Sequence, residues 1–338
     1  MIATPPFDLA LAWGLVIAFG VYAYVVLDGF DLGVGTLFVA IRDAKQRDTM
    51  VNSIAPVWDG NETWLVLGGG GLFAAFPLAY AVVLPALYAP LMAMLLALIF
   101  RGVAVEFRFK TQRLKPLWDV AFSAGSIVAT FCQGIALGAF IQGIAVEGRA
   151  YGGGWWDWLT PFSLMTGAAL VVGYALLGAT WLIMKTEGGL QGHCYRLARP
   201  LGAAVVALIG VVSIWTPLTE PAVATRWFSW PNIAFLSPVP LLVAAAAFGL
   251  YRALAARREI LPFLFALSLF TLSFIGLGIS LYPYIIPRSV TIWQAAAPES
   301  SLAFTFVGVA VLVPIILAYT GHAYWVFRGK VDPGASYH

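Results

Sequence analysis

The sequence has little charge. Asp, Glu, Lys and Arg make up 10% of its 338 residues, whereas a soluble domain carries about 25%. Hydrophobic residues make up 61% instead, which is typical of an integral membrane protein. A net charge of +3 without a basic tract argues against a nucleic-acid partner. The start, MIATPPFD, has no Lys or Arg ahead of its apolar run, which argues against a cleaved signal peptide.

Cysteine and histidine are also scarce. Cys132 is predicted in mid-helix and Cys194 in a loop, and both are predicted to be free thiols. The three histidines are predicted in an inner loop, at the end of the last span and at the end of the chain, respectively His193, His322 and His338. Haem ligation within a membrane needs His, Met or Cys inside the helix bundle, and scattered methionines fit a packed core better than a ligand set. The sequence therefore predicts no metal or redox group in this chain.

The apolar runs predict nine membrane-spanning helices, because about 20 apolar residues cross roughly 30 Å of hydrocarbon. The seventh is the shortest of these runs. The predicted spans are 9–41, 56–77, 80–100, 117–145, 161–184, 200–218, 235–251, 260–282 and 302–325.

The basic residues test this arrangement. The tail and the connections after odd-numbered spans hold 16 of the 19 Lys and Arg residues, and the exceptions are Arg149, Arg226 and Arg288. Short loops rich in Lys and Arg stay in the cytoplasm. We therefore expect the N-terminus outside and the C-terminus in the cytoplasm.

Acidic residues within the spans are confined to the first four. These are Asp28, Asp31, Asp59, Glu62 and Asp119. Asp28 and Asp31 are three residues apart and share a helix face, as do Asp59 and Glu62. Asp59 and Asp119 begin spans that run outward, so they are expected near the cytoplasmic rim. Arg101, at the inner end of the third span, is the expected counter-ion.

Ionisable side chains within a membrane are costly and usually line a bundle interior or an aqueous path. Desolvation and neighbouring carboxylates favour the protonated form of an acid, so such a cluster can take up and release protons. The sequence thus predicts a proton path from the cytoplasmic rim. A structural alternative stays open, in which the acids pair with Arg101 or cap helices. Asp59 follows Pro56 closely enough to be an N-cap, and Trp58 is assigned a structural or charge-partner role beside Arg101.

Small residues spaced four apart predict close helix packing in lipid. Gly29 with Gly33, and Gly134 with Gly138, have this spacing.

Five stretches of the sequence resemble subunit II of cytochrome bd-type quinol oxidases. They are DGFDLGVG (28–35), NSIAPVWDGNETWLVLGGGGLFAAFP (52–77), FRGVAVEFRFK (100–110), LYPYIIPRSVTIWQAAAPESSLAF (281–304) and VPIILAYTGHAYWVF (313–327). The stretches follow in order from the first span to the last, so the resemblance covers nearly the whole chain. The stretch RGVAVEFR resembles the sequences of the cyanide-insensitive subgroup.

The resemblance implies an all-α membrane fold of two four-helix bundles, about 9–145 and 161–282, with a peripheral ninth helix at 302–325. It implies a bacterial cytoplasmic membrane enzyme that oxidises quinol and reduces O₂ to water without pumping protons. The haems lie in the partner, subunit I, and subunit II alone is not catalytic and binds no haem. Some members hold a structural quinone in subunit II or add a small single-span subunit.

The resemblance also implies a cytoplasmic proton channel in subunit II. Mapped by motif, its acids are Asp31, Asp59 and Asp119, and Asp28 shares the first motif. Position 62 is Glu in some members and Gln in others, which weakens Glu62 as an obligatory carrier.

Two other functions stay open. A purely structural partner would use its acids for assembly only. A proton-coupled secondary transporter would be expected to place charges at the midplane of both halves, and the second half of this chain has no charge in its apolar runs.

Overall fold

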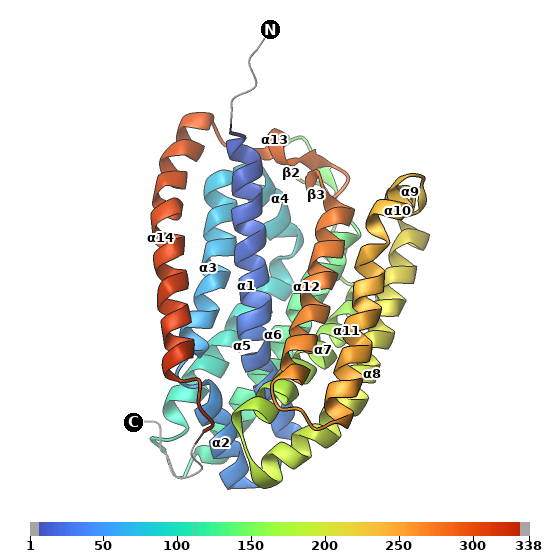
Figure 1. The fold of residues 1–338 in the computed structure, drawn as a ribbon. Helices are drawn as coiled ribbons and strands as arrows, with labels where there is room; N and C mark the ends of the chain where they lie inside the picture. Colours follow the sequence, from blue (N-terminus) through green and yellow to red (C-terminus); the bar gives the residue numbers. More distant parts are fainter. Residues whose placement is uncertain (1–6, 112, 332–338) are drawn as a thin grey trace.

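The computed structural model describes residues 7–111 and 113–331 of the chain. It is a bundle of long helices that lie roughly along one axis (Figure 1). The first helix, α1 (Leu9–Leu37), continues into the 3₁₀ turn η1 (Phe38–Ala40), and the short α2 (Ala44–Ile54) follows at the end of the bundle. We call this end the α2 end. Asp8 caps α1, because its carboxylate accepts a hydrogen bond of 2.9 Å from the Leu11 amide.

Four helices complete the first half of the chain, and the predicted third span is divided between two of them. Pro77 begins one helix and Pro85 lies near its end, where a missing N–H and ring crowding weaken the helix. Leu87 separates that helix from the next, so the expectation of one continuous helix over 80–100 is wrong. The four helices are α3 (Trp58–Ala75), α4 (Pro77–Ala86), α5 (Tyr88–Phe107) and α6 (Lys115–Ile141).

The second half contains further long helices with short pieces between them. One of them begins at Gly188, not at 200, because its first turns are polar and a hydropathy scan does not register them. Cys194 and His193 therefore lie in a helix, which corrects their predicted loop positions, and both cysteines are free as predicted. The helices are α7 (Pro161–Lys185), α8 (Gly188–Thr219), α9 (Pro221–Phe228), α10 (Asn232–Leu236), α11 (Pro238–Ala255), α12 (Leu261–Leu281), α13 (Ile292–Ala295) and α14 (Glu299–Val326).

Two small antiparallel hairpins lie at the opposite end of the bundle, which we call the hairpin end (Figure 1). In the first, β1 (Val146–Glu147) pairs with β2 (Ala150–Tyr151), and Val146 is opposite Tyr151. In the second, β3 (Tyr284–Ile286) pairs with β4 (Val290–Thr291).

Eight helical segments in the described residues are long and apolar enough to cross a membrane, so the mostly helical, multi-pass prediction is confirmed. The eighteen-residue α3, which corresponds to the predicted second span, is not among them. Polar residues in its first turns lower its hydropathy, although it lies beside α1 in the bundle (Figure 1). The count of nine spans and the grouping into two four-helix bundles stay predictions.

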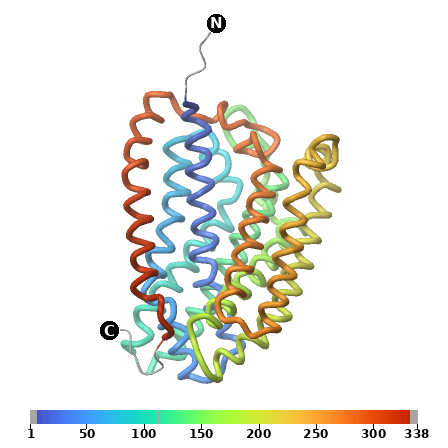
Figure 2. The backbone as a smooth tube through the Cα atoms, in the orientation of Figure 1, coloured from blue at the N-terminus to red at the C-terminus, as the bar shows by residue number. Residues whose placement is uncertain are grey.

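The backbone runs back and forth along the bundle, as Figure 2 shows. Helix α1 begins at the hairpin end and α14 ends at the α2 end. Which end faces the cytoplasm stays a prediction.

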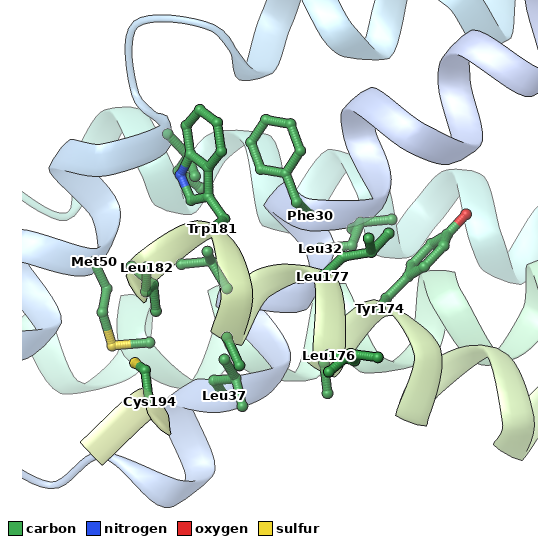
Figure 3. Packing of buried hydrophobic residues seen from close by; sticks show 14 of the residues in the cluster. Phe30, Leu32, Leu37, Met50, Tyr174, Leu176, Leu177, Trp181, Leu182 and Cys194 are labelled. Atoms are coloured by element: carbon green, nitrogen blue, oxygen red, sulfur yellow. The ribbon is translucent and has the colours of Figure 1, made fainter. Parts of the chain in front are cut away.

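Close packing of α1 against α7 forms the core of the bundle. A Cβ on Gly33 would lie 1.8 Å from the backbone oxygen of Tyr174, so only glycine fits there. The predicted contact of Gly134 is confirmed as well, because its Cβ would lie 2.5 Å from the Thr166 oxygen. Phe30 and Trp181 stack with ring centroids 4.1 Å apart in this core (Figure 3). Helices in lipid associate through such close approach.

Candidate functional site

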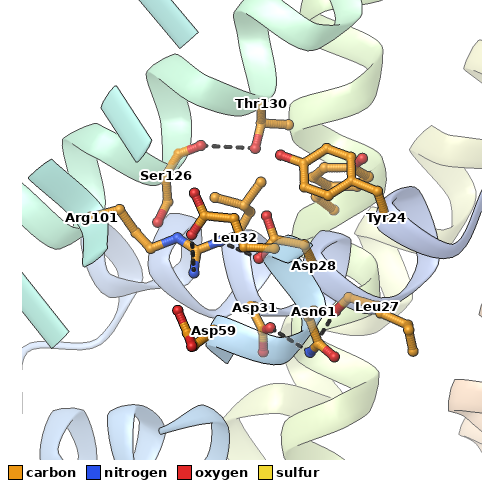
Figure 4. A network of polar contacts seen from close by, with 12 residues as sticks. Tyr24, Leu27, Asp28, Asp31, Leu32, Asp59, Asn61, Arg101, Ser126 and Thr130 are labelled. Carbon is orange, nitrogen blue, oxygen red and sulfur yellow. Dashed lines mark hydrogen bonds and ion pairs between the residues drawn. The ribbon is translucent and has the colours of Figure 1, made fainter. Parts of the chain in front are cut away.

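Helix α1 carries two acids in the interior of the bundle. Asp28 and Asp31 are both 0% exposed, and we call them the buried carboxylate pair. Figure 4 shows Asp28 toward Arg101 and Asp31 toward Asn61. Their spacing of three residues places them on one face of α1, as predicted, and that face meets α3 and α5.

The sequence predicts Arg101 of α5 as a counter-ion of the acid cluster, and the acid that it pairs with directly is Asp28. Its guanidinium donates a hydrogen bond to Asp28 Oδ1, and both side chains are fully buried. The Nη1 atom of Arg101 lies 3.8 Å from Glu62 Oε2, and the Glu62 side chain is 28% exposed. The Arg101 guanidinium carbon lies 5.4 Å from the centroid of the Trp58 ring, a cation–π contact. One buried cation thus has one buried acid, one half-buried acid and one aromatic ring as neighbours.

Asp31 has a different environment, because no cation pairs with it among the described residues. Asn61 of α3 donates from Nδ2 to Asp31 Oδ2 at 2.7 Å, while Asp31 Oδ1 has no hydrogen-bond partner within the described part of the chain. The hydroxyl of Tyr324 donates to Asn61 Oδ1 at 2.9 Å. Burying an unpaired carboxylate is expensive, so Asp31 is the member of the pair that can most readily carry a proton.

Asp59 is exposed and lines a pocket of about 480 Å³ between the first turn of α3 and the last turns of α14. We call it the α3–α14 pocket. Asn61 and Tyr324 also line it, so the same two side chains contact the pocket and form the link to Asp31. The N-cap residue of α3 is Val57, so the capping interpretation of Asp59 is wrong. Its carboxylate lies in the first turn, where the helix dipole favours negative charge.

Asp119 lies in a separate group at the α2 end. Its carboxylate pairs with Arg47 Nη1 at 3.0 Å and with Arg108 Nε at 2.5 Å. Arg108 Nη1 also pairs with Asp48 at 2.5 Å, and Lys115 pairs with Asp48 at 2.8 Å. Partial burial disfavours the charged form of Asp48, but hydrogen bonds from Lys115 and Arg108 outweigh it and hold the pKa of Asp48 below its ordinary value. The five predicted acids therefore fall into two groups, because Asp119 is held between two arginines.

A second hydrogen-bonded chain lies next to the buried carboxylate pair, toward the hairpin end. Gln133 of α6 donates from Nε2 to the Tyr24 hydroxyl at 2.7 Å and accepts from the Tyr174 hydroxyl at 3.0 Å. Tyr24 lies one turn before Asp28 on α1, and Figure 4 shows it near Thr130. Polar side chains thus continue from the acids into the membrane-spanning part of the bundle.

Sequence reasoning missed three residues of this site. Asn61 and Glu106 belong to motifs that carry the family resemblance, and Glu106 lines the α3–α14 pocket. Tyr324 belongs to the motif of the last span. Periodicity along one helix gave no signal for any of them, because their roles depend on contacts between helices. Among the residues that the structure describes, no group of His, Cys, Asp and Glu is placed to hold a metal ion.

Comparison with known proteins matches this chain over nearly its whole length. A family model described as cytochrome bd terminal oxidase subunit II matches residues 9–327. Cytochrome bd-I ubiquinol oxidase subunit 2 of Escherichia coli K12 is 33% identical over 366 residues, which cover 96% of this chain and 95% of that protein. Cytochrome bd ubiquinol oxidase subunit 2 of Bacillus subtilis is 27% identical, and the match covers 95% of this chain and 96% of that protein.

A solved structure shares the fold. A chain in the structure of bd oxidase from Geobacillus thermodenitrificans superposes with a TM-score of 0.77 at 17% identity, covering 95% of this chain and 99% of that one. The sequence matches, the family model and the helical bundle agree, and the chain belongs to the cytochrome bd terminal oxidase subunit II family.

Proposed function

We propose that this chain is the non-haem subunit of a bd-type quinol oxidase, in the cytoplasmic membrane of a bacterium. Family membership makes it a subunit of that oxidoreductase complex, with subunit I as its partner. In this proposal the partner holds the haems and reduces O₂ to water, whereas this chain stabilises the partner and supplies it with protons. A structural quinone and a small single-span subunit are further proposed components.

The observation that carries the proton role is the imbalance of charge in the interior. Two fully buried acids share one fully buried arginine, and only Asp28 pairs with it directly. A structural ion pair needs one acid, and a second buried acid without a cation adds a desolvation cost. A group that exchanges protons explains why Asp31 is there.

The α3–α14 pocket supplies the entrance in this proposal. It opens at the α2 end, lined by the exposed acids Asp59 and Glu106, and it reaches Asn61, the hydrogen-bond donor to Asp31. We place the α2 end in the cytoplasm, since most basic residues lie in connections at this end. Protons drawn from that side make O₂ reduction electrogenic. Moving one charge across the membrane is worth about 2.3 kcal/mol for each 100 mV of membrane potential.

A purely structural role is the main competing function, and one observation favours it. Asp119, Asp48 and their cationic partners form a network that joins the inner connections and needs no proton transfer. A secondary transporter has weaker support, because the acids that contact Arg101 or Asn61 in the described part of the chain lie on α1 and α3.

The test is Asp59→Asn in the intact two-subunit complex. We expect slower O₂ consumption with normal haem spectra, because the variant removes an acid at the entrance that forms no ion pair with any described residue. Glu299→Gln is the matched control, since Glu299 is an exposed acid in the first turn of α14 at the hairpin end. Normal turnover of a fully assembled Asp59→Asn complex would contradict the proton role, and failure to assemble would favour the structural one.

A further inference from the structure

Two side chains from different helices connect the α3–α14 pocket to the buried carboxylate pair. Asn61 of α3 is 1% exposed and donates to Asp31, and Tyr324 of α14 donates to Asn61. Both side chains line the pocket. They form a hydrogen-bonded link from the pocket to Asp31.

The Tyr324 hydroxyl anchors the carbonyl end of the Asn61 amide. It donates to Oδ1 at 2.9 Å, and the amino end points to Asp31 Oδ2 at 2.7 Å and to the Leu27 oxygen at 3.3 Å. The Leu27 oxygen can only accept, so it keeps the amino group on this side of the amide. The amino group can only donate, so it supports a carboxylate at Asp31. Without the hydroxyl, the carbonyl end of the Asn61 amide loses its hydrogen bond, and the amino group is held less precisely against Asp31.

Tyr324 itself is held firmly. Its ring meets Phe30 edge to face at 6.4 Å and Trp181 at 6.2 Å between centroids. The end of α14 is tied to α7, because the Lys185 ammonium donates to the backbone oxygens of Phe327 and, at 2.8 Å, of Gly329. The hydroxyl is thus presented to Asn61 from a fixed ring, and Tyr324→Phe removes the hydrogen bond while it keeps the packing.

We propose that Tyr324 is a positioning residue for Asp31: through the Asn61 amide it holds in place the hydrogen-bond donor that Asp31 meets at the boundary of the α3–α14 pocket. This inference rests on the proposed function and gives α14 a part in it. The charged and titratable groups that surround Asp31 are Asp28 of its own helix, Glu62 of α3, Arg101 of α5 and Tyr324 itself. Of these, Tyr324 alone hydrogen-bonds to the Asn61 amide.

The experiment compares Tyr324→Phe with Tyr251→Phe in the intact oxidase. Tyr251 of α11 is 69% exposed, lies outside the α3–α14 pocket and makes no hydrogen bond among the described residues. For Tyr324→Phe we expect kcat for O₂ consumption to fall about three- to tenfold, the effect of one lost hydrogen bond. The pH profile of kcat should shift, while the KM for quinol and the haem spectrum stay unchanged. Tyr251→Phe should match the parent in all four measurements.

A double-variant cycle shows whether Tyr324 acts through Asn61. In an Asn61→Ala background, Tyr324→Phe should cause no further loss of kcat, since the group it positions is gone. Equal, additive losses in both backgrounds would overturn the inference, as would failure of Tyr324→Phe to assemble.

The inference and the proposed function can fail separately. If Asp31→Asn slows turnover while Tyr324→Phe behaves like Tyr251→Phe, the inference alone is wrong. If Asp31→Asn and Asp59→Asn complexes both turn over normally, the proposed function is wrong, and the inference falls with it.

Discussion

The two acids of the buried carboxylate pair should respond differently to the same substitution. Asp28→Asn leaves Arg101 fully buried without its direct partner, and the remaining carboxylate, that of Glu62, is 3.8 Å away and partly solvated. Removing one partner of a buried ion pair costs about 3–5 kcal/mol. We expect a loss of stability in the lower part of this range, since Glu62 compensates in part.

Asp31→Asn removes a carboxylate that pairs with no cation in the part of the chain that the structure describes. An asparagine at this position keeps an oxygen that can accept the hydrogen bond from Asn61, so the stability change should stay below about 1 kcal/mol. Turnover should nevertheless fall, because an amide cannot carry the proton. Asp31→Asn is thus predicted to separate stability from activity, whereas Asp28→Asn lowers both.

The assay combines thermal denaturation of the detergent-purified complex, followed by loss of haem absorbance, with O₂ consumption at saturating quinol. As a control, Asp28→Leu together with Arg101→Met replaces the pair by apolar side chains and should regain most of the lost stability. It should not regain turnover. The reasoning is refuted if Asp28→Asn denatures at the parent temperature, or if Asp31→Asn destabilises the complex as much as Asp28→Asn does.

Two further predictions concern packing and pH. Gly33→Ala should prevent assembly or destabilise the complex by about 1–3 kcal/mol or more, since its Cβ would meet the Tyr174 backbone. Gly69→Ala should be silent, because no atom of the described residues of this chain, its own helix aside, lies within 4 Å of the added Cβ. Purification yield and thermal denaturation measure the effect of each substitution. Equal effects of the two would contradict the close packing of Gly33 against the Tyr174 backbone. The pKa of Asp48 is lowered in the fold, so its ion pairs stabilise the α2 end above its unfolded pKa of about 3.9. That stability is lost as pH falls through the lower pKa that Asp48 has in the folded protein. Asp48→Asn should therefore abolish this part of the loss of stability in acid, which is measured by following the stability of the complex as a function of pH.

Much of this fold could be predicted from hydropathy and charge. Long apolar runs define helices because the bilayer sets their length, and the positions of Asp28 and Asp31 on one face of α1 follow from helix periodicity. The helix ends were less predictable. The break at Leu87 depends on how nearby prolines act within an apolar run, and the early start of α8 lies in a polar stretch that hydropathy does not register.

The site was predictable only in part, because its contacts join helices that are far apart in sequence. Arg101 was expected to be a counter-ion of the acid cluster, since each of these is a rare charge that needs a partner in the membrane, but the choice of Asp28 was not predicted. The separation of Asp119 from the other acids was not expected. Asp59 and Asp119 were both predicted near the cytoplasmic rim, and a position at the rim gives no information on distances in the plane of the membrane. Asn61 and Tyr324 are separated by 263 positions, and an amide or a phenol in an apolar run gives no charge signal.

The buried pair of Asp28 and Arg101 has a consequence for biosynthesis. Helix α1 emerges from the ribosome before α5, so the acid must enter the bilayer well ahead of its cation. A carboxyl group can wait there in neutral form by keeping its proton, but a guanidinium cannot shed its charge. The order of the two residues along the chain thus lets the member that can be neutralised enter the bilayer first. The arginine then inserts next to a carboxyl group that can give up its proton and pair with it.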